Sequence, residues 1–196
     1  MTESASAEFS TAQEEFWSGQ FGDSYISRNE GDDLVAANTA LFSEILQRSP
    51  GVSSVLEIGA NIGLNIRALQ TLLPKADFTG IEINRQAAQI LAETGCTVIH
   101  GSVLEAENLG SFDLVFTKGV LIHIAPDKLL DIYDRMAASA AKYIVLAEYY
   151  NPVPVAIPYR GHDDRLFKRD FAGELLDRHP EFELAGTGFA YHRGDF

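Results

Sequence analysis

The chain has 196 residues, 46% of them apolar, and this length and composition predict one folded domain with a full core. Its 15 basic and 28 acidic residues give a formal net charge of −13, which disfavours a nucleic-acid partner because such binders present basic surface to phosphates. A single cysteine permits no internal disulfide, the polar start is unlike a signal peptide, and no apolar run reaches roughly 18 residues, so we expect a cytoplasmic protein that does not span a membrane.

Residues 1–50 are predicted to form a helical cap, or lid, ahead of a core made by residues 51–196. Residues 1–10 are expected to be a loose tail, after which Thr11 is a candidate N-cap for a short helix followed by a glycine-containing loop. In residues 32–51, apolar side chains recur near a period of 3.6 before a Pro-Gly pair, which predicts a longer helix that ends there.

From residue 51 onward, short apolar runs alternate with helical patterns. This alternation is typical of an α/β fold with a Rossmann-like, doubly wound and mainly parallel sheet, which binds ligands beyond the carboxyl ends of its strands. The sequence predicts strands at residues 54–58, 77–83, 97–100, 112–117, 143–147 and 182–191, and helices after Gly63, over 85–94, from about Pro126 and over 168–180.

The turn after the first strand, in the stretch SVLEIGANIGLNI, carries the strongest signal. Gly59 and Gly63 allow the backbone to approach a ligand where a Cβ would clash. A dinucleotide site prefers the spacing G-x-G-x-x-G, whereas here Asn61 occupies the middle and Glu57 precedes the first glycine. A carboxylate at that point repels a pyrophosphate and accepts hydrogen bonds from an ammonium group. The turn therefore favours S-adenosylmethionine, a cofactor with an amino-acid tail and no phosphates.

Later strand ends supply candidates for the rest of that cofactor. Glu82 ends the second strand, where a carboxylate accepts hydrogen bonds from both ribose hydroxyls. Ser102 follows the third strand and is expected at the adenine edge, with Ile83 and Val103 on the two faces of the ring. Lys118 follows the fourth strand and is a candidate partner for the cofactor carboxylate, or a surface residue.

These features occur in the order found in class I S-adenosylmethionine-dependent methyltransferases, which the sequence resembles through Glu57, Gly59, Asn61, Gly63, Glu82, Ser102 and the stretch FDLV. The stretches FWSGQFGDSYISRNEGDD, FTKGVLIHIAPDKL, AEYYNPVP and YRGHDDRLFKRDFAGELL are similar to small methylases associated with pseudaminic acid biosynthesis. This resemblance covers nearly the whole chain and implies a methyltransferase fold, a small-metabolite substrate and no metal. Many class I enzymes carry Asp where this chain has Ser102. The fold usually adds a final antiparallel strand, which either lies beyond Phe196 or is missing from the sheet.

Methyl transfer needs donor and acceptor atoms about 3–3.5 Å apart, and an amine or hydroxyl acceptor must also lose a proton. His123 follows the fourth strand and is the first candidate base, because its pKa class suits proton transfer near neutral pH; alternatively, it satisfies a loop carbonyl. Tyr25 is expected, with Arg28 and Asn29, in a lid over donor and acceptor, where Trp17 staples the lid or packs on the cofactor.

The segment after the fifth strand is the one cationic and aromatic cluster in this acidic chain. Arginine forms bidentate hydrogen bonds with carboxylate or phosphate oxygens, so the segment favours a small anionic substrate. Alternatively, Asp163, Asp164 and Asp170 pair with its bases on a solvated face. The candidate catalytic or substrate-binding residues here are Tyr150, Arg160, His162 and Lys168, accompanied by Tyr149, Tyr159, Arg165 and Arg169.

The sequence thus predicts an S-adenosylmethionine-dependent methyltransferase that acts on oxygen or nitrogen of a small anionic metabolite, such as a carboxylated or amino sugar or an amino acid. S-adenosylhomocysteine would be its product, and no metal, nucleic acid or membrane partner is expected. The alternatives are a nicotinamide-dependent oxidoreductase, which Glu57 and Asn61 disfavour, and a non-catalytic S-adenosylmethionine-binding module. Cys96 is expected to serve packing, and the oligomeric state stays open.

Overall fold

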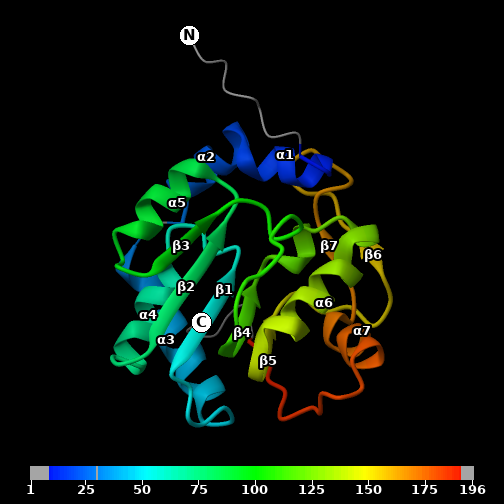
Figure 1. The fold of residues 1–196 in the computed structure, drawn as a ribbon. Coiled ribbons are helices and arrows are strands. Elements are labelled where there is room, and N and C mark those ends of the chain that lie inside the picture. The colour runs from blue at the N-terminus through cyan, green and yellow to red at the C-terminus, as the bar shows by residue number, and fades with distance from the viewer. Residues whose placement is uncertain (1–8, 30, 191–196) are drawn as a thin grey trace.

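The computed structural model describes residues 9–29 and 31–190 and contains a five-stranded parallel sheet in the order β3-β2-β1-β4-β5 (Figure 1). The strand order reverses between β1 and β4, which is the point where doubly wound sheets bind ligands. This arrangement confirms the predicted fold class. The strands are β1 (Ser54–Ile58), β2 (Asp77–Glu82), β3 (Thr97–His100), β4 (Phe112–Lys118) and β5 (Ala140–Ala147).

Both faces of the sheet are buried, which explains the nearly continuous apolar runs of its strands. Val55 and Phe116 point to one face and pack with the half-buried Cys96, while Leu56 and Val115 point to the other. Helices α3 (Asp32–Leu46), α4 (Leu64–Leu72) and α5 (Arg85–Ala92) cover the first face, and α6 (Leu129–Ser139) and α7 (Phe171–Arg178) cover the second.

Two short helices, α1 (Ala12–Ser18) and α2 (Gln20–Ile26), cross the carboxyl ends of the strands (Figure 1). Thr11 caps α1 as predicted, in a capping box with Glu14. The prediction of a glycine-containing loop after α1 is wrong, because α2 occupies that position. Gly22 lies inside α2, where a Cβ would come within 1.9 Å of the Trp17 carbonyl oxygen, so this glycine permits close packing of α2 on the end of α1.

The prediction of a sixth strand over residues 182–191 is also wrong: residues 182–190 form no strand, and the last predicted position lies outside the described residues. This segment has no ladder partner in the described part of the chain. Its backbone is held by a side chain instead, since the Arg48 guanidinium donates to the Thr187 carbonyl oxygen at 2.7 Å. The loop before α7 contains an unpredicted antiparallel hairpin of β6 (Val155–Ala156) and β7 (Phe167–Lys168).

Within the ranges described, no helix has the length and apolar character needed to cross a bilayer. The same ranges hold no cluster of three or more His, Cys, Asp or Glu side chains arranged to bind a metal ion.

Gly63 is required by the packing of α4 on α5. Its φ is 82°, and a Cβ there would lie 2.8 Å from side-chain carbons of Leu91 and Thr94. We expect Gly63→Ala to lower the free energy of unfolding by about 1–3 kcal/mol, because left-handed backbone strain and overpacking add. Denaturant unfolding measures the loss. Gly95 is the matched control, since it has a φ of 81° with nothing within 4 Å of an added Cβ. An equal loss in Gly95→Ala would show that packing contributes nothing at Gly63.

Candidate active site

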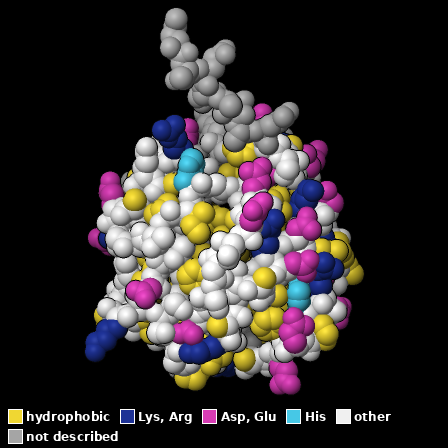
Figure 2. Space-filling view, in the orientation of Figure 1, with side chains coloured by type: hydrophobic (Ala, Val, Ile, Leu, Met, Phe, Trp, Pro, Cys, Tyr) yellow, Lys and Arg dark blue, Asp and Glu magenta, His cyan; other side chains and the backbone are white. Residues whose placement is uncertain are grey.

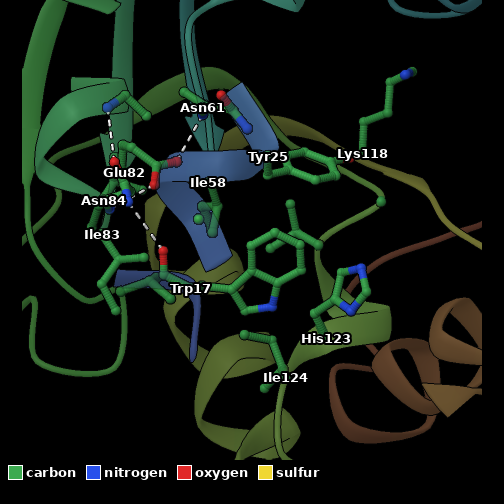
Figure 3. Close-up of a pocket in the computed structure, with 18 of the residues that line it drawn as sticks. Trp17, Tyr25, Ile58, Asn61, Glu82, Ile83, Asn84, Lys118, His123 and Ile124 are labelled. Carbon is green, nitrogen blue, oxygen red and sulfur yellow. Dashed lines mark hydrogen bonds between the residues drawn. The ribbon is translucent and has the colours of Figure 1, made fainter. Parts of the chain in front are cut away.

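A cavity of about 250 Å³ lies at the carboxyl ends of the central strands, beneath α1 and α2 (Figure 3). Nine of the fifteen predicted catalytic, substrate-binding or cofactor residues line it: Tyr25, Gly59, Asn61, Glu82, Ile83, Ser102, Val103, Lys118 and His123. Six others are not part of its lining: Glu57, Gly63, Tyr150, Arg160, His162 and Lys168. Trp17 and Asn29, expected in the lid, line it as well.

The glycine turn presents backbone to this cavity. Gly59 has a φ of 72°, and a Cβ there would meet a methyl carbon of Val120 at 2.7 Å. Asn61 also adopts the left-handed region, with a φ of 48°, and its side-chain oxygen accepts the Ile62 N–H at 2.7 Å. The turn is therefore held in shape by its own asparagine, while Gly59 allows Val120 to approach.

Glu82 is only 7% exposed and is fixed at the end of β2 by backbone donors. Its Oε2 accepts the Asn61 N–H and its Oε1 accepts the Asn84 N–H, both at 2.7 Å (Figure 3). Burial raises the pKa of Glu82, and these backbone hydrogen bonds oppose that rise. A carboxylate oxygen has more than one lone pair, so Glu82, fixed by these donors, is preorganised to receive a pair of hydroxyl groups as well.

Glu57 lies behind the cavity wall, in contact with a residue that the sequence analysis missed. Its Oε1 accepts a hydrogen bond from Asn65 Nδ2 at 2.6 Å, and Asn65 lines the cavity. Glu57 Oε2 and Asn65 Oδ1 are both buried without a hydrogen-bond partner in the described parts of the chain. Burial raises the pKa of Glu57 to about 8, against the opposing effects of Asn65 and Lys118. The orphaned Asn65 oxygen, in the cavity lining and backed by the Glu57 carboxyl, fits the ammonium group of an amino-acid tail.

His123, in the short 3-10 helix Leu121–His123, has a defined tautomer. Its Nδ1 lies 2.6 Å from the Arg165 carbonyl oxygen, and because a carbonyl only accepts, Nδ1 carries the hydrogen and Nε2 keeps its lone pair. Burial lowers the pKa of His123, although this hydrogen bond opposes the shift, so the ring is neutral at neutral pH. The ring thus satisfies a loop carbonyl and also presents a basic nitrogen.

Aromatic side chains from α1, α2 and the loop after β5 surround His123. The Trp17 ring centroid lies 4.6 Å from that of His123 and 5.2 Å from that of Tyr25, and the Tyr159 ring lies 5.2 Å from His123 (Figure 3). Asn84, also missed in the sequence, ties the cap to β2, since its Nδ2 donates to Asp23 Oδ1 at 2.8 Å and to the Trp17 carbonyl oxygen at 3.3 Å. Trp17 of α1 is therefore the cap residue that packs on the candidate base.

The basic segment after β5 lies beside this cluster, and part of its charge is paired. Arg165 binds Asp164 at 2.5 Å, a pair that the solvated-face alternative named, although the Arg165 side chain is only 14% exposed. Arg169 binds Glu174 at 2.6 Å. Asp170 instead caps α7 through the Gly173 N–H. The remaining members stack on rings or are exposed: Lys168 lies 5.1 Å from the Tyr149 ring, Arg160 lies 5.7 Å from the Tyr159 ring, His162 meets the edge of Phe16 at 5.1 Å, and Tyr150 is 65% exposed.

The coloured side chains in Figure 2 show acidic and basic groups interspersed, with no broad basic patch among the described residues of that face. This distribution agrees with the net charge of −13. It offers no track for a nucleic-acid backbone on the face shown.

Comparison with known proteins gives a match to a family model over part of the chain and a set of solved structures with the same fold. Residues 56–142 match the family model described as "Methyltransferase domain". No curated protein matches the chain. The plantazolicin methyltransferase BpumL, solved in complex with SAH (S-adenosylhomocysteine), aligns with a TM-score of 0.56 at 16% identity over 71% of this chain, and the chain spans only 58% of the length of that protein.

Two further solved structures have the same fold. The sugar N-methyltransferase KedS8 from Streptoalloteichus sp ATCC 53650 aligns with a TM-score of 0.56 at 16% identity, over 82% of this chain and 68% of its own. Magnesium protoporphyrin IX methyltransferase (ChlM) from Synechocystis PCC 6803, with bound SAH, aligns with a TM-score of 0.59 at 14% identity, over 84% of this chain and 86% of its own. The family model covers less than half of the chain, and these solved structures show its fold, which is that of class I S-adenosylmethionine-dependent methyltransferases. S-adenosylmethionine is the methyl donor of that class.

Proposed function

We propose that the protein transfers a methyl group from S-adenosylmethionine to an oxygen or nitrogen atom of a small anionic metabolite. The observation that carries this proposal is His123, a buried neutral imidazole in the cavity wall whose Nε2 is free to accept a proton. A hydroxyl or ammonium acceptor must lose a proton on methylation, and a positioned histidine removes it.

The cofactor side of the cavity is assigned by the chemistry of its lining. Asn65, with Glu57 behind it, would hold the ammonium group, and Glu82 would bind the ribose hydroxyls. Ile83 and Val103 would flank the adenine ring. When bound, the cofactor supplies an electrophilic methyl group on a sulfonium, so the protein itself supplies no nucleophile. Lys118 remains a candidate for the cofactor carboxylate, although its ammonium end points away from Trp17 and His123 (Figure 3).

Two arginines support an anionic acceptor. The Arg28 guanidinium lies 5.2 Å from the Phe21 ring and 5.7 Å from the Tyr25 ring, and the Arg160 guanidinium lies 5.7 Å from the Tyr159 ring of the same aromatic cluster. Neither arginine forms an ion pair among the described residues. Each is therefore available to a carboxylate or phosphate at the cavity mouth.

The proposed acceptor is a carboxylated or amino sugar, or a related amino acid. The resemblance to pseudaminic acid-associated methylases supports an acidic sugar, and the sugar N-methyltransferase KedS8 is among the proteins of like fold. In this proposal residues 1–50 act as the cap that closes donor and acceptor off from water.

Paired acceptors test the anionic preference. Each carboxylated acceptor is assayed with its neutral methyl ester, using wild type, Arg28→Gln and Arg160→Gln. Loss of an arginine–carboxylate contact is expected to lower kcat/KM for the acid by about 10- to 100-fold while leaving the ester unchanged. Lys75→Gln, an exposed cation in the turn before β2, is the control. Equal losses on acid and ester, or a wild-type preference for esters, would refute the anionic acceptor.

A further inference from the structure

A carboxylate from the N-terminal cap reaches the loop that follows β3. Glu14 of α1 is only 7% exposed and accepts a hydrogen bond from the hydroxyl of Ser102, and both residues line the cavity. The Arg135 guanidinium holds the same loop, since it donates hydrogen bonds to the carbonyl oxygens of Leu104 and Ala106. Ser102 Oγ also accepts the Leu104 N–H at 3.0 Å. The Ser102 hydroxyl hydrogen is thus directed at Glu14, and the two side chains form one polar wall.

The two oxygens of Glu14 have different surroundings. Oε2 accepts hydrogen bonds from the Ser10 hydroxyl at 2.6 Å and from the Thr11 N–H and hydroxyl at 2.8 and 3.0 Å. Among the described residues, Oε1 accepts from Ser102 alone. A carboxylate oxygen has two lone pairs, and with a single donor on Oε1 one of its lone pairs remains for a ligand. Burial raises the pKa of Glu14, but the hydrogen bonds from Ser10, Ser102 and Thr11 outweigh it and hold the pKa below its usual value. Glu14 is therefore charged at neutral pH.

This buried charge lies beside the apolar slot assigned to the adenine ring. Ile83 and Val103 line the same cavity as Glu14 and Ser102, at the ends of β2 and β3. The Glu14 carboxylate is a negatively charged hydrogen-bond acceptor at the edge of this slot. It therefore favours a planar ligand that carries a hydrogen-bond donor. The adenine 6-amino group is a donor, whereas the 6-oxo group of hypoxanthine is an acceptor and would be repelled.

We propose that Glu14 receives the adenine 6-amino group of the methyl donor, so that helix α1 of the cap completes the cofactor site and sets its base specificity. The inference rests on the proposed methyltransferase function. Ser102, assigned to the adenine edge from the sequence, then acts as the residue that positions Glu14. The cap helix also joins the two halves of the site, because Glu14 faces the adenine slot while Trp17, three residues later, packs on His123.

Binding of two nucleosides that differ at the 6-substituent, and in the hydrogen that the 6-oxo base carries on N1, tests the inference. SAH and S-inosylhomocysteine, its 6-oxo counterpart, are titrated into wild type, Glu14→Gln, Ser102→Ala and Glu15→Gln. Isothermal calorimetry measures the affinities, and the emission of Trp17, the one tryptophan in the chain, reports on α1 directly. Glu14→Gln retains a residue suited to a capping box, so the helix start is preserved. Glu15 is its exposed neighbour and serves as the matched control.

Wild type is expected to bind SAH about 10- to 100-fold more tightly than S-inosylhomocysteine, the effect of one hydrogen bond to a charged acceptor. Glu14→Gln should bring that ratio close to one, Ser102→Ala should reduce it, and Glu15→Gln should leave it unchanged. If wild type binds both nucleosides equally, or if a folded Glu14→Gln keeps the preference, the inference is overturned. Thermal unfolding checks that each variant is folded. If Glu14→Gln is not folded, a Ser102→Ala variant that keeps the wild-type affinity ratio of SAH to S-inosylhomocysteine overturns the inference. If wild type binds neither nucleoside, the proposed function itself fails.

Discussion

Replacing His123 with glutamine is expected to lower kcat by about 10²- to 10⁴-fold and to change SAH affinity by less than about twofold. Nδ1 of His123 donates to the Arg165 carbonyl oxygen, which leaves Nε2 as the proton acceptor in the cavity wall. Glutamine fills similar space but has no basic nitrogen. Because the methyl donor binds on the Glu82 side of the cavity in the proposed function, its affinity should survive the change.

The pH profile separates a base from a structural histidine. Burial lowers the pKa of His123 below its ordinary value of 6.5. Protonated imidazole accepts no proton, so kcat should fall as the pH drops through this lowered pKa, which lies below pH 6.5. Above that pKa the ionisation of His123 should cause no further change in kcat. The acidic limb should disappear in His123→Gln. Stability follows the same sign: the unfolded state binds the proton more readily, so the free energy of unfolding falls as the pH drops below the unfolded pKa.

A matched histidine controls for general effects. His179 binds Asp134 at the end of α7, away from the cavity, and His179→Gln should leave kcat unchanged. Thermal unfolding of His123→Gln checks that the contacts with Trp17 and Tyr159 were not essential to the fold. A kcat within tenfold of wild type, with the acidic limb intact, would show that His123 serves the Arg165 carbonyl alone.

The grouping of the proposed cofactor residues in one cavity could be predicted from sequence, because they lie at or just after strand ends. The carboxyl ends of parallel strands meet at one edge of the sheet, so Gly59, Asn61, Glu82 and Ser102 were expected together, and all four line the cavity. The periodicity of apolar residues indicated these strands correctly. It failed after residue 182, where apolar residues alternate in a segment with no strand partner in the described part of the chain.

The other half of the site depends on contacts between distant segments. Glu14 and Ser102 are 88 residues apart, and Trp17 meets His123 across a similar interval. Periodicity shows which face of a helix is buried, but not which distant loop it meets. Gly22 illustrates the limit: as a residue type it indicates a turn, whereas its role here is to let α2 pack against the Trp17 carbonyl. Asn65 was missed for a related reason, since its importance comes from the buried Glu57 behind it.

Binding of SAH is expected to strengthen as the pH rises from 6 towards 8, by up to about tenfold per pH unit, with release of a proton. Glu57 is 1% exposed, and burial raises its pKa to about 8, so most of it is protonated at pH 7 before the cofactor binds. The ammonium group of SAH, received by Asn65 in the proposed site, favours the ionised carboxylate and lowers that pKa. Binding must therefore expel the proton. Calorimetry in buffers of different ionisation enthalpy measures the number of protons released on binding.

The sign of the proton exchange distinguishes Glu57 from its neighbour Lys118. Burial lowers the pKa of Lys118, so a cofactor carboxylate bound there would raise it and cause proton uptake. Glu57→Gln should abolish the release and weaken SAH binding at pH 8 by about 10- to 100-fold, the effect of one charge-assisted hydrogen bond. Glu93→Gln, at the exposed end of α5, should retain both the release and the affinity. Proton uptake that persists in Glu57→Gln would assign the proton exchange on binding to Lys118. An affinity for SAH that does not change with pH in wild type would show that Glu57 stays protonated and takes no part in holding the ammonium group.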